Sequence, residues 1–269
     1  MELTGRHVVI TGAGQGIGRA LAKAMASEGA RAVVVADIDS DSAEEVAGEI
    51  GGLAVAMDVA HESEIQALVS QAQEANGPID LFCSNAGVAG PRGGPLAPDD
   101  EWQRTWEVNA MAHVWAARAL LPEMLLRRDG YLLITASAAG LLTQVSAMAY
   151  SATKHAAVGI AEWLAINYGG AGIKVSCLCP AGVRTQMLDA ALEDPIGAAP
   201  LLAGGLLDPT DVADSVIAGI RDERFLILPH ESVAMQMVLK GSEPERWVNG
   251  MRGLVGDARA LDPAAGGGT

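Results

Sequence analysis

Tyr150 and Lys154, four residues apart, are the side chains of this sequence whose types and spacing most clearly suggest chemistry. On a helix, residues four apart lie on one face, so the phenol and the ammonium would stand side by side. A free tyrosine has a pKa of about 10 and is a poor base at neutral pH. A cation at ~4 Å in an effective dielectric of ~20 contributes about 4 kcal/mol, which would lower the pKa of the phenol towards neutrality. Such pairs also occur by chance on surface helices, so the surrounding sequence must show whether this pair is functional.

A glycine-rich turn near the start of the chain is the first of these elements. It lies between a strand-like apolar run at 6–10 and a strongly helix-forming segment. Its spacing is G-x-x-x-G-x-G through Gly12, Gly16 and Gly18, because Ile17 stands where the commoner dinucleotide pattern has its third glycine. Strand, glycine turn and helix N-terminus form the arrangement in which backbone N–H groups receive a pyrophosphate. We therefore expect a dinucleotide-binding turn rather than a merely flexible one.

An acidic residue closes the second apolar run. Asp37 ends the run 31–37, nineteen residues beyond Gly18. A carboxylate at the end of the second strand can accept hydrogen bonds from both hydroxyls of an adenosine ribose, and it would repel a 2′-phosphate. No Arg or Lys follows at 38–40 to bind such a phosphate. This pattern predicts NAD rather than NADP.

With these elements placed, the chain resembles the short-chain dehydrogenase/reductase family, in its NAD-preferring Tyr-x-x-x-Lys type, over roughly residues 1–230. Ser137 precedes Tyr150 by thirteen residues, as the family pattern expects. One departure is Ala181, which stands where the family usually has glycine directly after proline. The glycine comes one residue later, at Gly182, and this substitution affects the geometry of the turn. The matches, in family order, are Thr11 to Gly18, Asp37, Asp58, Asn85-Ala86-Gly87, Asn109, Ser137, Tyr150 with Lys154, and Pro180 to Thr185.

The resemblance implies hydride transfer between a carbinol carbon and a nicotinamide. Tyr150 would then handle the hydroxyl proton, Lys154 would lower its pKa and bind the nicotinamide ribose, and Ser137 would donate to the substrate oxygen. Asn109 resembles the family residue that holds a water linking the lysine to solvent; a polar interruption in a tryptophan-rich helix explains it equally well. By the same resemblance, Asp58 would meet the adenine amino group, Asn85 would line the far side of the cofactor, and the residues after Pro180 would meet the nicotinamide carboxamide. The implied cofactor-binding residues are Gly12, Gln15, Gly16, Ile17, Gly18, Asp37, Asp58, Val59, Asn85, Ala86, Gly87, Tyr150, Lys154, Pro180, Gly182, Val183 and Thr185.

The substrate is indicated only as a class. The segment 186–207, rich in Leu, Ala, Gly and Pro, should cover the active site, and Arg184 is the one basic residue near it. This favours a secondary alcohol or ketone with an apolar body, such as a steroid, terpenoid or alicyclic alcohol, although helix packing explains the same residues almost as well. An NADPH-dependent carbonyl reductase and a non-catalytic nucleotide-binding protein of the same fold are the alternatives. The expected substrate residues are Ser137, Leu142, Gln144, Tyr150 and Met187.

The composition restricts the class of protein. The chain has 269 residues, half of them hydrophobic, which suffices for one large α/β core. Its net charge of −15 argues against nucleic acid or an anionic membrane surface as a partner. No apolar run approaches a membrane span, so the cytoplasm is the expected location. Cys83, Cys177 and Cys179 are expected to be buried core residues in a reducing compartment, and no metal site is expected.

Apolar strands alternate with amphipathic helices along the chain. This predicts an α/β fold with helices on both faces of a mostly parallel sheet. The family resemblance implies the rest of the architecture: a single doubly wound Rossmann domain over 1–262, with a seven-stranded sheet in the order 3-2-1-4-5-6-7. The tail 263–269 is expected to be disordered. Strands are predicted near 6–12, 31–37, 53–58, 79–84, 130–136, 173–179 and 225–229, and helices beginning near 16, 40, 61, 101, 146 and 208.

The last part of the chain departs from the common family ending. The sequence of 231–255 predicts an extra amphipathic helical segment that covers either the substrate pocket or a neighbouring subunit. A homodimer through the helices near 101–128 and 146–168 is expected by the resemblance, and a homotetramer stays open. Trp102, Trp106 and Trp115 recur near helical spacing and would serve either this interface or the protein's own sheet.

Overall fold

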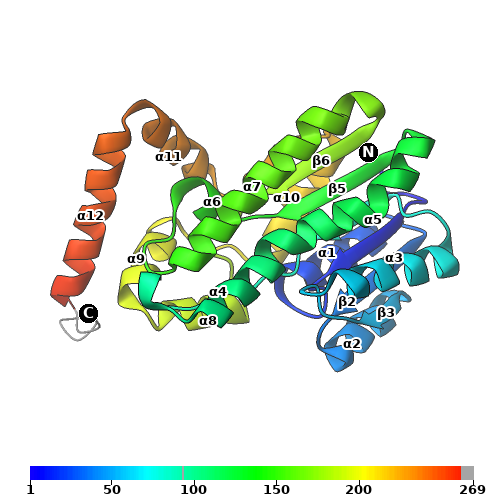
Figure 1. Ribbon diagram of the computed structural model, residues 1–269, viewed down its shortest axis with the longest axis horizontal. Helices are drawn as coiled ribbons and strands as arrows, with labels where there is room; N and C mark the ends of the chain where they lie inside the picture. Colours follow the sequence, from blue (N-terminus) through cyan, green and yellow to red (C-terminus); the bar gives the residue numbers. More distant parts are fainter. Residues whose placement is uncertain (93, 262–269) are drawn as a thin grey trace.

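The computed structural model describes residues 1–92 and 94–261, and a seven-stranded sheet forms its centre (Figure 1). Neighbouring strands all pair in parallel, in the order β3-β2-β1-β4-β5-β6-β7, so the predicted topology is confirmed. The expected disordered tail lies outside the described residues. The strands are β1 (His7–Thr11), β2 (Ala32–Asp37), β3 (Leu53–Ala56), β4 (Leu81–Ser84), β5 (Gly130–Thr135), β6 (Ile173–Leu178) and β7 (Leu226–Ile227).

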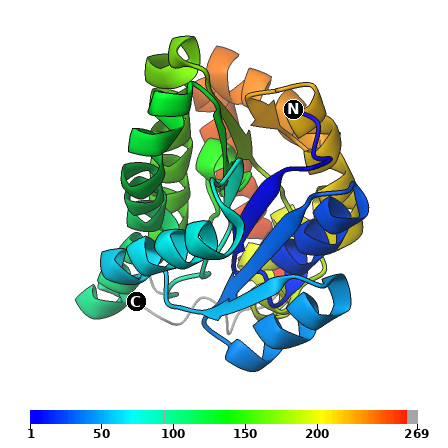
Figure 2. The same cartoon turned by 90° about the vertical axis from the view of Figure 1, so that its right-hand side faces the viewer.

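Helices cover both faces of the sheet (Figure 2). Because alternate strand residues point to opposite faces, Val8 and Ile10 join one core cluster while Val9 joins the other. Both faces are apolar, as a parallel sheet buried on two sides requires. One face is covered by α1 (Gly16–Ser27), α2 (Ser40–Ile50) and α10 (Pro209–Arg221), and the other by α3 (Glu62–Asn76), α5 (Ala112–Arg127) and α7 (Met148–Tyr168).

The helix predicted from residue 101 is divided. α4 (Asp99–Trp106) passes through a π-helical turn, Glu107–Met111, before α5 begins. A π-turn contains one residue more than an α-turn and is frequent at functional sites. Elsewhere, three short helices were not predicted: α6 (Ala139–Leu142), α8 (Gln186–Leu192) and α9 (Pro195–Ala203).

The C-terminal extension, expected as a helical segment at 231–255, consists of two helices. α11 (Glu231–Ser242) ends before Glu243, and α12 (Pro244–Leu261) starts at a new angle. The proline explains the break, since it lacks an N–H and keeps the preceding residue out of the helical region. In Figure 1, α12 lies at one end of the molecule, remote from the sheet, where its contacts are with α9 and α11.

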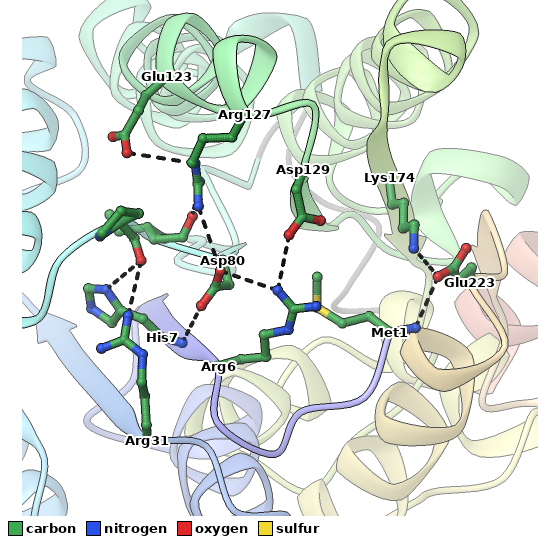
Figure 3. Close-up of polar contacts among 12 residues, drawn as sticks. Met1, Arg6, His7, Arg31, Asp80, Glu123, Arg127, Asp129, Lys174 and Glu223 are labelled. Atoms are coloured by element: carbon green, nitrogen blue, oxygen red, sulfur yellow. Dashed lines mark hydrogen bonds and ion pairs between the residues drawn. The ribbon is translucent and has the colours of Figure 1, made fainter.

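Polar groups close the end of the sheet at which the strands begin (Figure 3). Asp80, just before β4, accepts a hydrogen bond from the backbone N–H of His7 and forms ion pairs with Arg6 and Arg127. Arg6 also pairs with Asp129, just before β5. These contacts fix the amino ends of the central strands and leave ligand binding to their carboxyl ends, as is general for this architecture.

The three cysteines are buried and carry free thiols. The sulfurs of Cys177, in β6, and of Cys179, just after it, lie 3.7 Å apart. Within 1–92 and 94–261, no group of His, Cys, Asp and Glu side chains is arranged to hold a metal ion. Over the same residues, none of the helices combines the length and the apolar character that crossing a membrane requires.

Candidate active site

A cavity of about 780 Å³ opens at the carboxyl ends of the strands. It is lined by the glycine turn after β1, by the ends of β2 to β6, by α8 and α9, and by both helices of the C-terminal extension. Every site residue predicted from the sequence lines this cavity except Asn109. The sequence therefore identified one continuous site from motifs spread over most of the chain.

The glycine turn is shaped by close packing. Gly12 and Gly16 have φ of 63° and 54°, in the left-handed region that favours glycine. A Cβ on Gly12 would lie 2.8 Å from the Cα of Ala86, and one on Gly18 would lie 2.0 Å from the carbonyl oxygen of Gly12. Gln15, which precedes α1, makes no side-chain capping bond to the N–H groups of the first turn. The turn thus presents the backbone donors that a pyrophosphate needs.

Asp37 is held in place at the end of β2. It is 7% exposed, and its two oxygens accept from the backbone N–H groups of Gly14 (2.8 Å) and Asp39 (3.1 Å). Each carboxylate oxygen has a further lone pair, so the side chain can still accept from a ribose. Ile38 follows it and is 65% exposed, which leaves an apolar side chain where a 2′-phosphate would require a cation.

Asp58 has a partner that the sequence reasoning missed. Arg104, on α4, binds both its oxygens, at 2.9 and 3.0 Å, and the N–H of Ala60 donates to it as well. Burial acts to raise the pKa of Asp58, but these hydrogen bonds and the charge of Arg104 outweigh it and hold that pKa below its usual value. The carboxylate assigned to the adenine amino group is therefore already charge-paired. No local sequence signal links residues 58 and 104.

Hydrogen bonds tie the ends of three strands together beneath the cavity. The Thr11 hydroxyl accepts from the backbone N–H groups of Asn85 and Ala86, at 3.0 and 3.2 Å. The Asn85 side chain donates to the carbonyls of Thr11 and Gly12 and accepts from the hydroxyl of Thr135. The asparagine expected to line the far side of the cofactor thus also fixes the turn that would hold the pyrophosphate.

Lys154 is 3% exposed and donates to the carbonyl oxygen of Thr135 at 2.9 Å. Its Nζ lies 5.8 Å from the centroid of the Tyr150 ring. Burial lowers the pKa of Lys154 to about 8. The ammonium is therefore directed at the end of β5 and lies over the Tyr150 ring.

The lowered pKa predicted for Tyr150 is wrong for the protein alone. Burial raises the pKa of Tyr150, and the neighbouring hydroxyl of Ser137 opposes this increase only in part. Spacing along a helix predicts proximity, but it does not reveal that both members of the pair are largely removed from water, which disfavours the phenolate. Deprotonation of the phenol must therefore draw on charge that arrives with the ligands.

Ser137 follows β5 and is 8% exposed. Its hydroxyl accepts from the N–H of Ala139 at 3.0 Å and donates to the carbonyl of Pro180 at 3.4 Å. The second bond is long and therefore weak, so the proton can be redirected to a substrate oxygen. The first bond keeps the hydroxyl oxygen in place when that happens.

Asn109 lies behind the cavity wall, in the π-helical turn, and is completely buried. Its side-chain oxygen accepts from the N–H of Val88 (2.9 Å), and its nitrogen donates to Val88 O (2.8 Å) and to the hydroxyl of Thr153 (3.2 Å). A Cβ on Gly87 would lie 3.3 Å from both the Asn109 oxygen and Lys154 Nζ. Asn109 thus fixes the loop after β4 against α7, close to the lysine.

His113, one helical turn beyond Asn109, is a buried neighbour that the sequence reasoning missed. Its Nδ1 lies 2.7 Å from the hydroxyl of Ser84. Burial, reinforced by the charge of Lys154, lowers the pKa of His113 to about 3, so the ring is neutral at physiological pH. In the sequence, only its spacing of four residues from Asn109 indicates where His113 lies.

The substrate end of the cavity is largely apolar. Leu142 is buried there, Met187 lies at the mouth, and the Gln144 side chain donates to the carbonyl of Gly197 on α9 at 3.1 Å. The C-terminal extension forms part of the cavity wall, whereas the sequence left open whether it covers this pocket or a neighbouring subunit. Its contributions are Ser232, Val233 and Gln236 from α11 and Trp247, Met251 and Leu254 from α12.

Comparisons with known proteins agree with this geometry. The family model described as short chain dehydrogenase matches residues 6–195. The chain is 36% identical to 1-deoxy-11-beta-hydroxypentalenate dehydrogenase of Streptomyces exfoliatus, over 88% of this chain and 87% of that protein. It is 30% identical to estradiol 17-beta-dehydrogenase 11 of Mus musculus, over 92% and 83%. The crystal structure of a short-chain dehydrogenase/reductase from Burkholderia phymatum in complex with NAD superimposes with a TM-score of 0.83 at 32% identity, covering 91% of this chain and 96% of the other.

The chain belongs to the short-chain dehydrogenase/reductase family, and so to a class of oxidoreductases that act on alcohols and ketones. The resemblance inferred from the motifs is thereby confirmed at the level of the family.

Proposed function

We propose that this protein is an NAD(H)-dependent dehydrogenase/reductase of a secondary alcohol or ketone with an apolar body. The observation that carries the proposal is that Ser137, Tyr150 and Lys154 meet the glycine turn and Asp37 in one cavity. A protein that only binds nucleotides has no use for the first three. Of these groups, the turn and Asp37 suit the adenosine and pyrophosphate half of a dinucleotide.

The chain's own residues account for the movement of the proton. When an alcohol is oxidised, the Tyr150 phenolate takes its hydroxyl proton; when a ketone is reduced, the phenol returns a proton to the oxygen. The Ser137 hydroxyl donates to the same oxygen and holds it within reach of the phenol. Lys154 keeps a positive charge next to the ring, which favours the phenolate. A nicotinamide bound in the cavity supplies the hydride acceptor or donor.

Asp37 and Ile38 support NAD over NADP. The carboxylate would repel a 2′-phosphate, and the exposed Ile38 offers it no charge. The similar Burkholderia phymatum protein was crystallised with NAD, which is consistent with this preference. Titration with each cofactor, followed by quenching of tryptophan fluorescence, tests it: NAD should bind more tightly, and tighter binding of NADP would favour the carbonyl-reductase alternative.

The apolar wall supports the proposed substrate class. Leu142, Met187 and three side chains of α12 surround the far end of the cavity. The names of the two similar enzymes refer to a pentalenate derivative and to a steroid, both of which are polycyclic. A panel of steroid, terpenoid and alicyclic secondary alcohols should give NADH formation that disappears in Tyr150→Phe. If the panel is inert while NAD binds, a binding role becomes the better explanation.

We further propose a homodimer through α4, α5 and α7. These helices carry exposed apolar side chains at Trp106 (41%), Leu126 (86%), Trp163 (56%) and Ile166 (74%). Exposed apolar residues gathered on neighbouring helices are typical of subunit interfaces. Trp115, by contrast, packs against the protein's own core, as the alternative reading of the tryptophans predicted.

A further inference from the structure

His230 is the residue at which β7 passes into the C-terminal extension. It directly precedes α11, is 5% exposed, and makes two hydrogen bonds to one short loop. The backbone N–H of Ala181 donates to its Nδ1 at 3.2 Å, and its Nε2 lies 3.1 Å from the carbonyl oxygen of Gly182. An amide N–H can only donate and a carbonyl can only accept, so the ring must be neutral, with its proton on Nε2.

The loop that His230 contacts is the one at which this chain departs from the family pattern. Ala181 packs against the small apolar cluster of Ala138, Leu142 and Val233, the last of which belongs to α11. A Cβ on Gly182 would lie 2.5 Å from Cδ2 of Leu206, so a side chain there would require Leu206 to move. The alanine that replaces the usual glycine is thus packed against a residue of the extension.

Other hydrogen bonds hold the two ends of this loop, whereas its middle residue is held by His230. The Pro180 carbonyl accepts from the N–H of Ala138 at 2.8 Å, and the Gly182 carbonyl accepts from the N–H of Leu207 at 3.0 Å as well as from the imidazole. Within residues 1–92 and 94–261, the Ala181 N–H makes its hydrogen bond to His230. A buried N–H that loses its acceptor costs about 1–3 kcal/mol.

We propose that His230 is a positioning residue for cofactor binding: it sets the conformation of the 180–182 loop, and so the affinity for the nicotinamide half of the cofactor. The loop lines the cavity together with Ser137 and Tyr150, and its Pro180 carbonyl accepts hydrogen bonds from the Ser137 hydroxyl and the Ala138 N–H. The extension would then contribute to the cofactor site as well as to the substrate wall. This inference rests on the proposed use of NAD.

Calorimetric titration with two ligands tests the proposal without requiring turnover. NADH contains the nicotinamide, whereas ADP-ribose contains only the part expected to lie between the glycine turn and Asp37. His230→Ala should weaken NADH binding about tenfold, since 1.4 kcal/mol corresponds to a factor of ten, while ADP-ribose binding stays within about twofold. His230→Asn retains an acceptor for Ala181 and His230→Gln a donor for Gly182, so both should lie between the wild type and His230→Ala.

His7→Ala is the matched control. His7 is also a buried histidine with a lowered pKa, caused mainly by burial, but it lies at the opposite end of the sheet. It should lower the melting temperature without changing the ratio of the NADH and ADP-ribose affinities. Equal losses for both ligands in the His230 variants, or no loss in any of them, would overturn the positioning role. A wild-type protein that binds neither ligand would instead overturn the proposed function, and the inference with it.

Discussion

At the scale of single residues, burial dominates the chemistry of the site. Tyr150 and Lys154 are the expected neighbours, but both lie in surroundings that disfavour charge, and their pKa values move in opposite directions, up for the phenol and down for the ammonium. The two shifts leave both groups uncharged more readily than in water. A cationic ligand beside the phenol would reverse the balance for Tyr150.

Tyr150→Phe therefore separates chemistry from binding. We expect alcohol oxidation to fall by roughly 10²–10⁴-fold, the usual contribution of a positioned acid or base, while NADH still binds. In the wild type, kcat for oxidation should rise with pH, because the phenolate is the active form and burial raises its pKa. Steady-state rates between about pH 6 and 10, with a parallel binding titration, measure both. Retention of more than about a tenth of the activity in Tyr150→Phe would exclude it as the proton-handling group.

Asp37 and Ile38 determine the second prediction at this scale. The double variant Asp37→Ser, Ile38→Arg removes the repelling carboxylate and adds a guanidinium that can bind a 2′-phosphate. We expect NADP to bind at least about tenfold more tightly than in the wild type and NAD less tightly, because Asp37 also orients Gly14. Ile38→Ala is the control, which should leave the preference unchanged. If the affinity for NADP does not increase, the residues at the end of β2 do not recognise the adenosine ribose.

At the scale of elements, the C-terminal extension distinguishes this chain from relatives with the common ending. Trp247 and Met251 of α12 line the main cavity and also an adjoining groove of about 450 Å³. Both hollows include Leu142 and Thr143 on the facing side. α12 therefore contributes side chains to both hollows.

Trp247→Ala should consequently change which substrates are accepted. Loss of the indole joins the two hollows and removes apolar contact, so KM for the best alcohol of the panel should rise about tenfold, equivalent to ~1.4 kcal/mol, while larger members gain relative to smaller ones. The exposed neighbour Val248 supplies the control variant Val248→Ala. Specificity constants across the panel measure the effect, and an unchanged order of preference would place the substrate elsewhere.

The division of α4 from α5 and of α11 from α12 shows what pattern reading could and could not achieve. Pro244 is visible in the sequence and could have predicted the second break. The π-turn around Asn109 has no such marker, because the sequence through it is as helix-forming as its flanks. The cavity-lining motifs were predictable because each depends on local spacing, and the strand order because the family resemblance implies it. The partners of Asp58, His113 and His230 depend on which distant elements meet.

At the scale of the whole molecule, buried neutral histidines make stability depend on acidity. Burial lowers the pKa values of His7, His113 and His230, that of His113 to about 3. The unfolded chain therefore binds protons that the folded chain does not, and the free energy of unfolding decreases as pH falls below about 6.5.

His113→Asn should reduce this dependence. Between about pH 7.5 and 5, the wild type should lose about 2 kcal/mol through this histidine alone, and the variant should be spared that loss. Urea unfolding at the two pH values gives the difference directly. His61→Asn makes the same substitution at an exposed histidine and serves as the control. An identical pH dependence in His113→Asn would mean that His113 has the same pKa in the folded and the unfolded chain.

The proposed dimer can be tested at the same scale. Ile166→Glu places a charge on the exposed face of α7 and should shift the protein from dimer to monomer in sedimentation velocity, because a desolvated unpaired carboxylate opposes association. Val238→Glu introduces the same charge on α11, at a side chain of similar exposure, and should leave the dimer intact. A wild type that sediments as a monomer at all concentrations would contradict the interface.

The π-helical turn at Glu107–Met111 has a consequence for tolerance to insertions and deletions. One residue corresponds to about 100° of rotation around a helix axis. Deleting a residue from this turn would let α4 and α5 merge into an uninterrupted α-helix, and everything on one flank would rotate by that amount. Either Asn109 would leave the neighbourhood of Lys154, or the exposed Trp106 would turn towards the core. A surface loop tolerates the deletion of one residue, whereas this helix should not tolerate it although its composition is ordinary.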